Sequence, residues 1–100
     1  MVDINAIIKE QRVSLGGFFP LITCRDGLTF RPVDGYDRGS LPQNFNGPWT
    51  KLEIGFCYAR FDSIFEPVKN MTDPLTLKAP NVPVELINKM IQHHGGLVAG

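Results

Sequence analysis

The chain has 100 residues, 43% apolar and 20% charged, a composition typical of one globular domain rather than of a disordered protein. Ten Lys and Arg residues balance ten Asp and Glu residues, and neither sign forms a run. Because nucleic-acid binding depends on clustered positive charge, we expect no DNA or RNA partner.

The N-terminal segment predicts a short amphipathic helix. Asp3 is a suitable N-cap, Ile4, Ile7 and Ile8 fall on one stripe, and a Gly pair at 16–17 ends the pattern. The segment lacks the apolar region of a signal peptide, and no stretch of the chain is apolar enough to cross a bilayer. We therefore expect a cytoplasmic protein without a membrane partner.

Residues 18–33 predict a β-hairpin. The pair Asp26-Gly27 is typical of a two-residue type I′ turn, which would place Thr23 opposite Phe30. In that register one face of the hairpin, the predicted core face, carries Phe19, Leu21, Leu28 and Phe30.

The next expected elements are a strand, a short helix and a strand. Residues 50–58 alternate cleanly, with Leu52, Ile54, Phe56 and Tyr58 on one face and Lys51, Glu53, Gly55 and Cys57 on the other. Residues 61–68 predict one or two helical turns with Asp62 as a possible cap, and Pro67 prevents a longer helix. Residues 75–80 predict a last short strand.

Residues 81–96 predict the C-terminal helix, with Asn81 as its cap, Pro83 near its start and a Gly pair at its end. Its apolar stripe consists of Leu86, Ile87, Met90 and Ile91. The sequence thus predicts a single α+β domain, residues 1–100, with a small antiparallel sheet of three to four strands and N- and C-terminal helices packed on it.

The residue types that could carry metal or nucleophilic chemistry show no supporting pattern. His93 and His94 are neighbours on a helix and point about 100° apart, so they do not face one ion, and the helix dipole stabilises histidines at this end. Cys24 and Cys57 lie in predicted strands and have no cationic or Gly-rich surroundings that would activate a thiol. We expect no catalytic residue, no metal site and no cofactor.

The segment from Val33 to Trp49 is longer than ordinary connections in small domains. It is rich in Gly, Pro and Asn and carries aromatic and charged side chains that supply binding energy at interfaces: Tyr36, Asp37, Arg38, Phe45 and Trp49. These five residues are the predicted partner-binding site. A second interpretation is that Phe45 and Trp49 pack under the segment as part of the core.

Two stretches of the sequence, GPWTKLEIGF at 47–56 and PNVPVELINKMIQHHGG at 80–96, are similar to short uncharacterised proteins of tailed phages and prophages. The resemblance covers about a quarter of the chain. It implies a small phage accessory protein in the host cytoplasm, a class that often binds and inhibits a host protein, including host defence proteins.

Three functions remain open at this point. The first is a non-enzymatic module that binds a protein partner, or a second copy of itself as a homodimer, through the 33–49 segment and an exposed edge or face of the sheet. The second is a small enzyme or ligand-binding protein with a cleft between that segment and the C-terminal helix, in which His94, Arg38 and Asp37 would be the polar groups. The third is a structural virion component.

Overall fold

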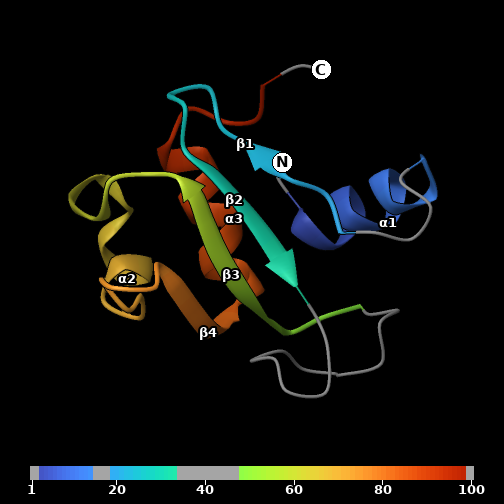
Figure 1. Cartoon of the computed structure of the whole chain (residues 1–100). Helices are drawn as coiled ribbons and strands as arrows, with labels where there is room; N and C mark the ends of the chain where they lie inside the picture. Colours follow the sequence, from blue (N-terminus) through green and yellow to red (C-terminus); the bar gives the residue numbers. More distant parts are fainter. Residues whose placement is uncertain (1–2, 15–18, 34–47, 99–100) are drawn as a thin grey trace.

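The computed structural model describes residues 3–14, 19–33 and 48–98 of the chain. Within them the elements follow the order α1, β1, β2, β3, η1, α2, β4, α3 (Figure 1). Their bounds are α1 Ile4–Ser14, β1 Ile22–Thr23, β2 Thr29–Val33, β3 Lys51–Tyr58, η1 Phe61–Ser63, α2 Glu66–Lys69, β4 Lys78–Pro83 and α3 Val84–His93.

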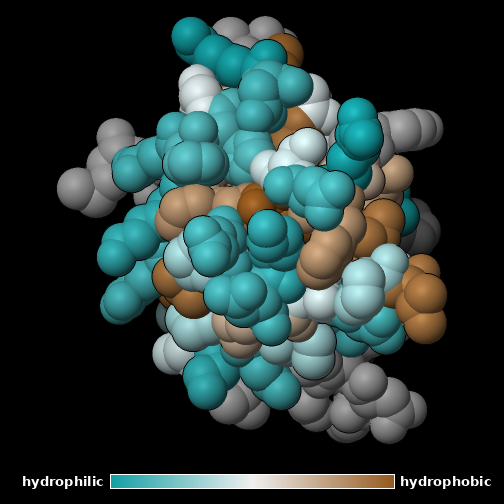
Figure 2. All heavy atoms as spheres, turned by 90° about the vertical axis from the view of Figure 1, so that its left-hand side faces the viewer, coloured by the Kyte–Doolittle hydropathy of each residue, from teal (hydrophilic) through white to brown (hydrophobic). Residues whose placement is uncertain are grey.

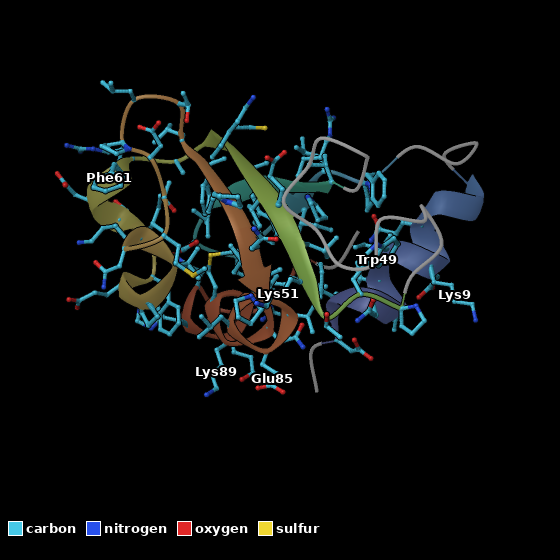
Figure 3. The ribbon with its side chains drawn as sticks, turned by 90° about the horizontal axis from the view of Figure 1, so that it is seen from below. Lys9, Trp49, Lys51, Phe61, Glu85 and Lys89 are labelled. Atoms are coloured by element: carbon cyan, nitrogen blue, oxygen red, sulfur yellow. The ribbon has the colours of Figure 1, made fainter. Side chains whose placement is uncertain are left out.

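The four strands form one antiparallel sheet in the order β1-β2-β3-β4. Helix α3 lies along one face of the sheet, and α1 and α2 lie to either side of α3 (Figures 1 and 3). The predicted α+β class and the terminal helices are therefore confirmed. No helix in the described ranges is long and apolar enough to cross a membrane.

The predicted register of the hairpin was wrong by one residue. Thr23 pairs with Thr29 and Ile22 with Phe30, because the loop has three residues, 25–27, and not two. The N–H of Gly27 donates to the carbonyl of Cys24 at 2.9 Å, and Gly27 adopts a φ of +98°, the arrangement of a three-residue hairpin loop.

This shift exchanges the two faces of the first strand. Since successive side chains of a strand point to opposite faces, Ile22 and Cys24 lie in the core beside Leu28 and Phe30. Leu21, which the sequence placed in the core, is 42% exposed.

The alternation predicted for β3 is confirmed. Leu52, Ile54 and Phe56 are buried, whereas Lys51 and Cys57 are exposed on the opposite face. The core face of β3 meets the stripe of α3, where Ile87, Met90 and Ile91 are fully buried. The rings of Phe30 and Phe56 lie 6.1 Å apart across β2 and β3 and extend this core.

The ends of the later elements differ from the predictions. Strand β4 begins at Lys78, three residues after the expected start, because the backbone of 73–77 forms a turn in which the N–H of Leu77 donates to the carbonyl of Asp73. Asn81 lies in β4 with a φ of +55° and does not cap α3, whose N-cap residue is Pro83. Asp62 likewise does not cap η1, whose N-cap is Arg60.

Helix α1 is fixed by capping and by two long-range contacts. The carboxylate of Asp3 accepts the N–H of Asn5 at 3.0 Å, as the sequence predicts for an N-cap. The side-chain amide of Asn5 donates to the carbonyl of Trp49 at 2.8 Å and accepts its N–H at 2.6 Å. The N–H of Ile4 donates to the side chain of Asn88 at 2.8 Å, which ties α1 to α3.

Candidate functional site

Of the five predicted partner-binding residues, the structure describes only Trp49. Tyr36, Asp37, Arg38 and Phe45 lie outside the described residues. Trp49 is only 4% exposed, belongs to the core and lies with its ring 5.6 Å from that of Phe19. Trp49 thus follows the second interpretation, a core residue, and does not offer its side chain to a partner in this structure.

Both edges of the sheet are poor sites for an added strand. Strand β1 has two residues, and beyond it Cys24 forms a bridge with Leu97. Strand β4 contains Pro80 and Pro83, which have no N–H, and its register shifts where Asn81 takes its positive φ. Short, bulged or Pro-containing edges resist pairing with another strand. The face of the sheet is therefore the better candidate for contact with a partner.

The face of the sheet opposite α3, which we term the open face, carries Arg31, Val33, Lys51, Glu53, Gly55, Cys57 and Lys78. Arg31 of β2 and Lys78 of β4 are both direct partners of Gly55 in β3. The two cations therefore flank a residue without a side chain. Their Cα atoms are about 10 Å apart, the width of two interstrand spacings. A Cβ at Gly55 would meet no atom within 4 Å.

The open face is more positive than the chain as a whole. It has three cations and one carboxylate, Glu53, although the chain has formal net charge zero. Arg31, Lys51 and Lys78 are exposed and make no ion pair with other described residues. Figure 3 shows Lys51 at the start of β3, whereas Glu85 and Lys89 project from α3 on the side away from the sheet.

The surface over α2 is a weaker candidate. In Figure 2 it is mainly hydrophilic, with apolar side chains scattered among polar ones. The most exposed large apolar residue in the described ranges, Leu75, is 92% exposed in the connection between α2 and β4. Single exposed apolar side chains of this kind are normal and do not define a binding site.

His94 and Asp26 form a second candidate at the other end of the sheet. His94 follows the last turn of α3 and is 5% exposed. Its Nδ1 lies 2.5 Å from Oδ2 of Asp26 in the hairpin loop, while its Nε2 is buried and has no hydrogen-bond partner in the described part of the chain. Backbone bonds support the same contact, because the N–H of Asp26 donates to the carbonyl of His94 at 3.3 Å and that of Arg25 to the carbonyl of Gly96 at 2.9 Å.

The surroundings of Asp26 favour its ionised form. Burial of the carboxyl acts to raise its pKa. Several interactions lower the pKa and together outweigh burial, the largest being the hydrogen bond from His94, the hydrogen bond from the N–H of Leu28 and the charge of His94. The pKa of Asp26 is consequently below its ordinary value of 3.8. Oδ1 accepts the Leu28 N–H at 3.1 Å, so both carboxylate oxygens have a donor.

A cavity of about 240 Å³ adjoins this pair and is lined by Asp26, Gly27, Leu28, Ala59, Arg60, Ser63 and His94. The hairpin loop, the connection from β3 to η1 and the end of α3 each contribute to it. The sequence suggested a cleft that joins His94 to Asp37 and Arg38, and these last two residues lie outside the described residues. Within the described residues, the acidic partner of His94 is Asp26.

A carboxylate, an imidazole and a hydroxyl in one cavity invite comparison with a nucleophilic triad. Because Nε2 of His94 has no hydrogen-bond partner, the hydroxyl of Ser63 is not bonded to the base that would have to activate it. The thiol of Cys24 is also a poor nucleophile, since burial and the nearby charge of Asp26 raise its pKa to about 11. The geometry of the described residues does not assemble an activated nucleophile.

Among the described residues, no group of three or more His, Cys, Asp or Glu side chains could hold a metal ion. Cys24 is buried and Cys57 is exposed, and both are free thiols.

Comparison of the chain with protein-family models, with curated proteins and with solved structures gives no match.

The sequence pointed to each of these two groups only in part, since it offered a face of the sheet and His94 but not Arg31, Lys78 or Asp26. Arg31 and Lys78 are far apart in the chain, and only the register of both strands with β3 shows that they flank Gly55. Asp26 was recognised as a turn residue, and its contact with His94 depends on the return of α3 to the hairpin. The Gly-rich end of α3 was a usable signal, because Gly96 donates to the carbonyl of Ile91 at 2.8 Å and turns the chain there.

Proposed function

We propose that this chain is a non-enzymatic protein-binding module whose open face binds an acidic surface of a partner protein. The observation that carries the proposal is the row Arg31–Gly55–Lys78, in which two exposed cations without an ion pair among the described residues flank a glycine with open space above it. Opposite potentials on two surfaces steer their association and help to fix their register. A flat row with a gap at its centre also lets acidic side chains approach the sheet closely.

The charge of the open face favours a different protein over a second copy of this chain. Two open faces in contact would bring six cations against two carboxylates, and like charges that lose water at an interface cost affinity. The experiment must therefore distinguish binding of a different protein from formation of a homodimer through this face. In line with the resemblance to phage proteins, we propose a host protein as the partner, with inhibition of its activity, such as a defence function, as the consequence.

The segment that carries Tyr36, Asp37, Arg38 and Phe45 stays part of this proposal. The segment follows β2 and precedes β3, so both of its connections are at the same end of these two neighbouring strands. We propose that these four side chains add contacts to a partner bound on that face. Trp49 is left out because it is buried.

The test compares two double variants with the same change in charge. Arg31→Glu with Lys78→Glu reverses the row, and Lys9→Glu with Lys89→Glu reverses two exposed cations on α1 and α3 away from the open face. Each purified protein captures partners from host lysate, and the protein retained by wild type is identified by mass spectrometry. Its dissociation constant for each variant is then measured by calorimetry at low and high salt.

We expect reversal of the row to weaken binding at least thirtyfold, about 2 kcal/mol, and the helix variant to bind like wild type. Tyr36→Ala with Arg38→Ala should weaken binding to a similar degree, with little change in the melting temperature. Equal binding by both charge variants would contradict the proposal. So would retention of nucleic acid alone, or self-association in sedimentation experiments that the row variant abolishes.

A further inference from the structure

The cavity beside His94 contains unpaired polar groups that the proposed protein contact does not use. Arg60 and Ser63 line it from the connection between β3 and α2, and both are exposed. Neither side chain has a hydrogen bond or ion pair among the described residues. His94 belongs to the same lining, and its Nε2 is buried without a hydrogen-bond partner among the described residues.

From these groups we infer that the cavity is a binding site for a phosphate group, free or carried as a phosphate monoester. Arg60 would pair with two phosphate oxygens through its guanidinium, and the hydroxyl of Ser63 would donate to a third. The site is independent of the open face, since it uses none of the residues of that face.

The carboxylate in the lining does not oppose this assignment. Asp26 already accepts one hydrogen bond at each oxygen, from the N–H of Leu28 and from His94. Both oxygens of Asp26 therefore already have a donor, whereas the guanidinium of Arg60 has neither a hydrogen bond nor a counterion among the described residues. The charged group of the lining without a polar partner is thus a cation, and the ligand that complements it is an anion.

His94 suits phosphate in either protonation state. With the proton on Nδ1 directed to Asp26, Nε2 has a lone pair and accepts the O–H of a monoprotonated phosphate; in the doubly protonated ring, Nε2–H donates to an oxygen. The atoms that cover Nε2 must shift before a ligand reaches it. Arg60 and Ser63 therefore make the first contacts, and the bond to Nε2 forms in the bound state.

The size of the cavity is the reason for including a monoester. A volume of about 240 Å³ is more than one phosphate group needs. The apolar wall formed by Leu28 and Ala59 can contact the organic part of the ligand. A phosphorylated side chain or a small phosphorylated metabolite fits this description.

The experiment is a titration of the ¹⁵N-labelled full chain with sodium phosphate, and separately with O-phosphoserine and with acetate, at constant ionic strength. Binding of phosphate or phosphoserine should saturate on the order of 1 mM and shift the amide signals of Gly27 and Ser63 and the ring nitrogens of His94. Tighter binding of phosphoserine than of phosphate would identify the monoester as the ligand, and the reverse would identify free phosphate.

Variants at exposed positions keep the test separate from folding. Arg60→Ala should weaken phosphate binding about tenfold, Arg60→Lys should restore part of it, and Ser63→Ala should weaken it about threefold. Lys89→Ala, a loss of one exposed cation on α3, is the matched control and should leave binding unchanged. Shifts that do not saturate, equal binding of acetate, or an equal effect of Lys89→Ala would overturn the inference. None of these results depends on whether the open face binds a protein.

Discussion

The imidazole of His94 and the carboxylate of Asp26, 68 positions apart in the chain, are joined through Nδ1 and Oδ2 at 2.5 Å. This contact holds the end of α3 against the hairpin loop, and the bridge between Cys24 and Leu97 continues the attachment toward the C-terminus. The side chain of His94 is 5% exposed and that of Asp26 49%, so the bond joins a buried ring to a carboxylate in contact with water.

The first prediction follows from the lowered pKa of Asp26. A carboxyl whose pKa is lower in the folded than in the unfolded chain adds stability above the unfolded value, near 3.8, and this stability is lost as pH falls through the folded value. Asp26→Asn should therefore cost about 1 kcal/mol at neutral pH, after allowance for solvent screening of the exposed carboxylate. Urea denaturation between pH 7 and pH 2.5 should show the difference from wild type shrinking below about pH 4.

Asp62→Asn is the control for this experiment, because Asp62 is an exposed acid of η1 without a hydrogen bond among the described residues. It should leave the stability nearly unchanged over the same pH range. A difference between Asp26→Asn and wild type that stays constant down to pH 2.5 would mean that the carboxylate of Asp26 does not stabilise the fold through its charge.

The hairpin shows both what could be predicted from the sequence and why the rest could not. Two β-rich runs around Asp26-Gly27 suffice to predict a hairpin, but a two-residue and a three-residue loop both place a glycine at a positive φ near that point. The choice between them moves every side chain of the first strand to the other face. Burial of Ile22 and Cys24 in the core makes that choice, and this packing is not visible in the local sequence.

Elements with a clear period were predicted more accurately than elements without one. The alternation in β3 and the stripe of α3 placed Phe56 and Met90 in the core correctly, since each pattern has one consistent solution. Strand β4 continues beyond its expected end at residue 80 because Asn81, in a left-handed conformation, extends it through a bulge that propensities do not predict. The His94 site combines residues 26–28, residues 59–63 and His94, and a contact between such distant segments cannot be predicted from a local sequence pattern.

The second prediction concerns the core. Phe56 of β3 is 7% exposed and belongs to the core, with its ring near that of Phe30 in β2. Phe56→Ala should reduce the free energy of unfolding by about 3 to 5 kcal/mol, since it removes a buried ring and leaves a cavity. Cys57→Ala, one residue further on the open face, should change it by less than about 0.5 kcal/mol. A loss below 1 kcal/mol for Phe56→Ala in denaturant melts would show that this face of β3 is not the core.

The third prediction concerns the attachment of α1. The amide of Asn5 both donates to and accepts from the backbone of Trp49, and so acts like a short piece of strand beside it. Asn5→Asp keeps the shape but removes the donor and places a carboxylate near the Trp49 carbonyl. We expect a loss of about 1 to 3 kcal/mol, because a partly buried carbonyl loses its partner.

Tryptophan fluorescence reports this change directly, since the chain has one Trp. The emission of Trp49 should move to longer wavelength in Asn5→Asp under native conditions as α1 separates and water reaches the ring. Glu10→Gln, a substitution at an exposed position further along α1, should leave both the emission and the stability unchanged. An unchanged spectrum together with unchanged stability in Asn5→Asp would show that α1 does not depend on this contact.

The last prediction compares two glycines whose surroundings differ. Gly55 lies at the centre of β3 on the open face, where an added Cβ would meet no atom within 4 Å. Gly55→Ala should therefore stabilise the protein by about 0.4 to 1 kcal/mol, because alanine restricts the unfolded chain and needs no adjustment in the fold. Gly95 follows α3 with a φ of +90°, and an added Cβ would come within 3.2 Å of Cβ of Arg25.

Gly95→Ala should in consequence destabilise the protein by about 1 to 3 kcal/mol, since both the backbone conformation and the contact with the hairpin oppose a side chain. Thermal melts of the two variants should shift in opposite directions from wild type. The ¹⁵N spectrum of Gly95→Ala should also show changes at Asp26 and His94, whose contact depends on the path of the chain after α3. If Gly95→Ala were as stable as wild type with the signals of that pair unmoved, the turn at the end of α3 would not be what holds His94 against the hairpin.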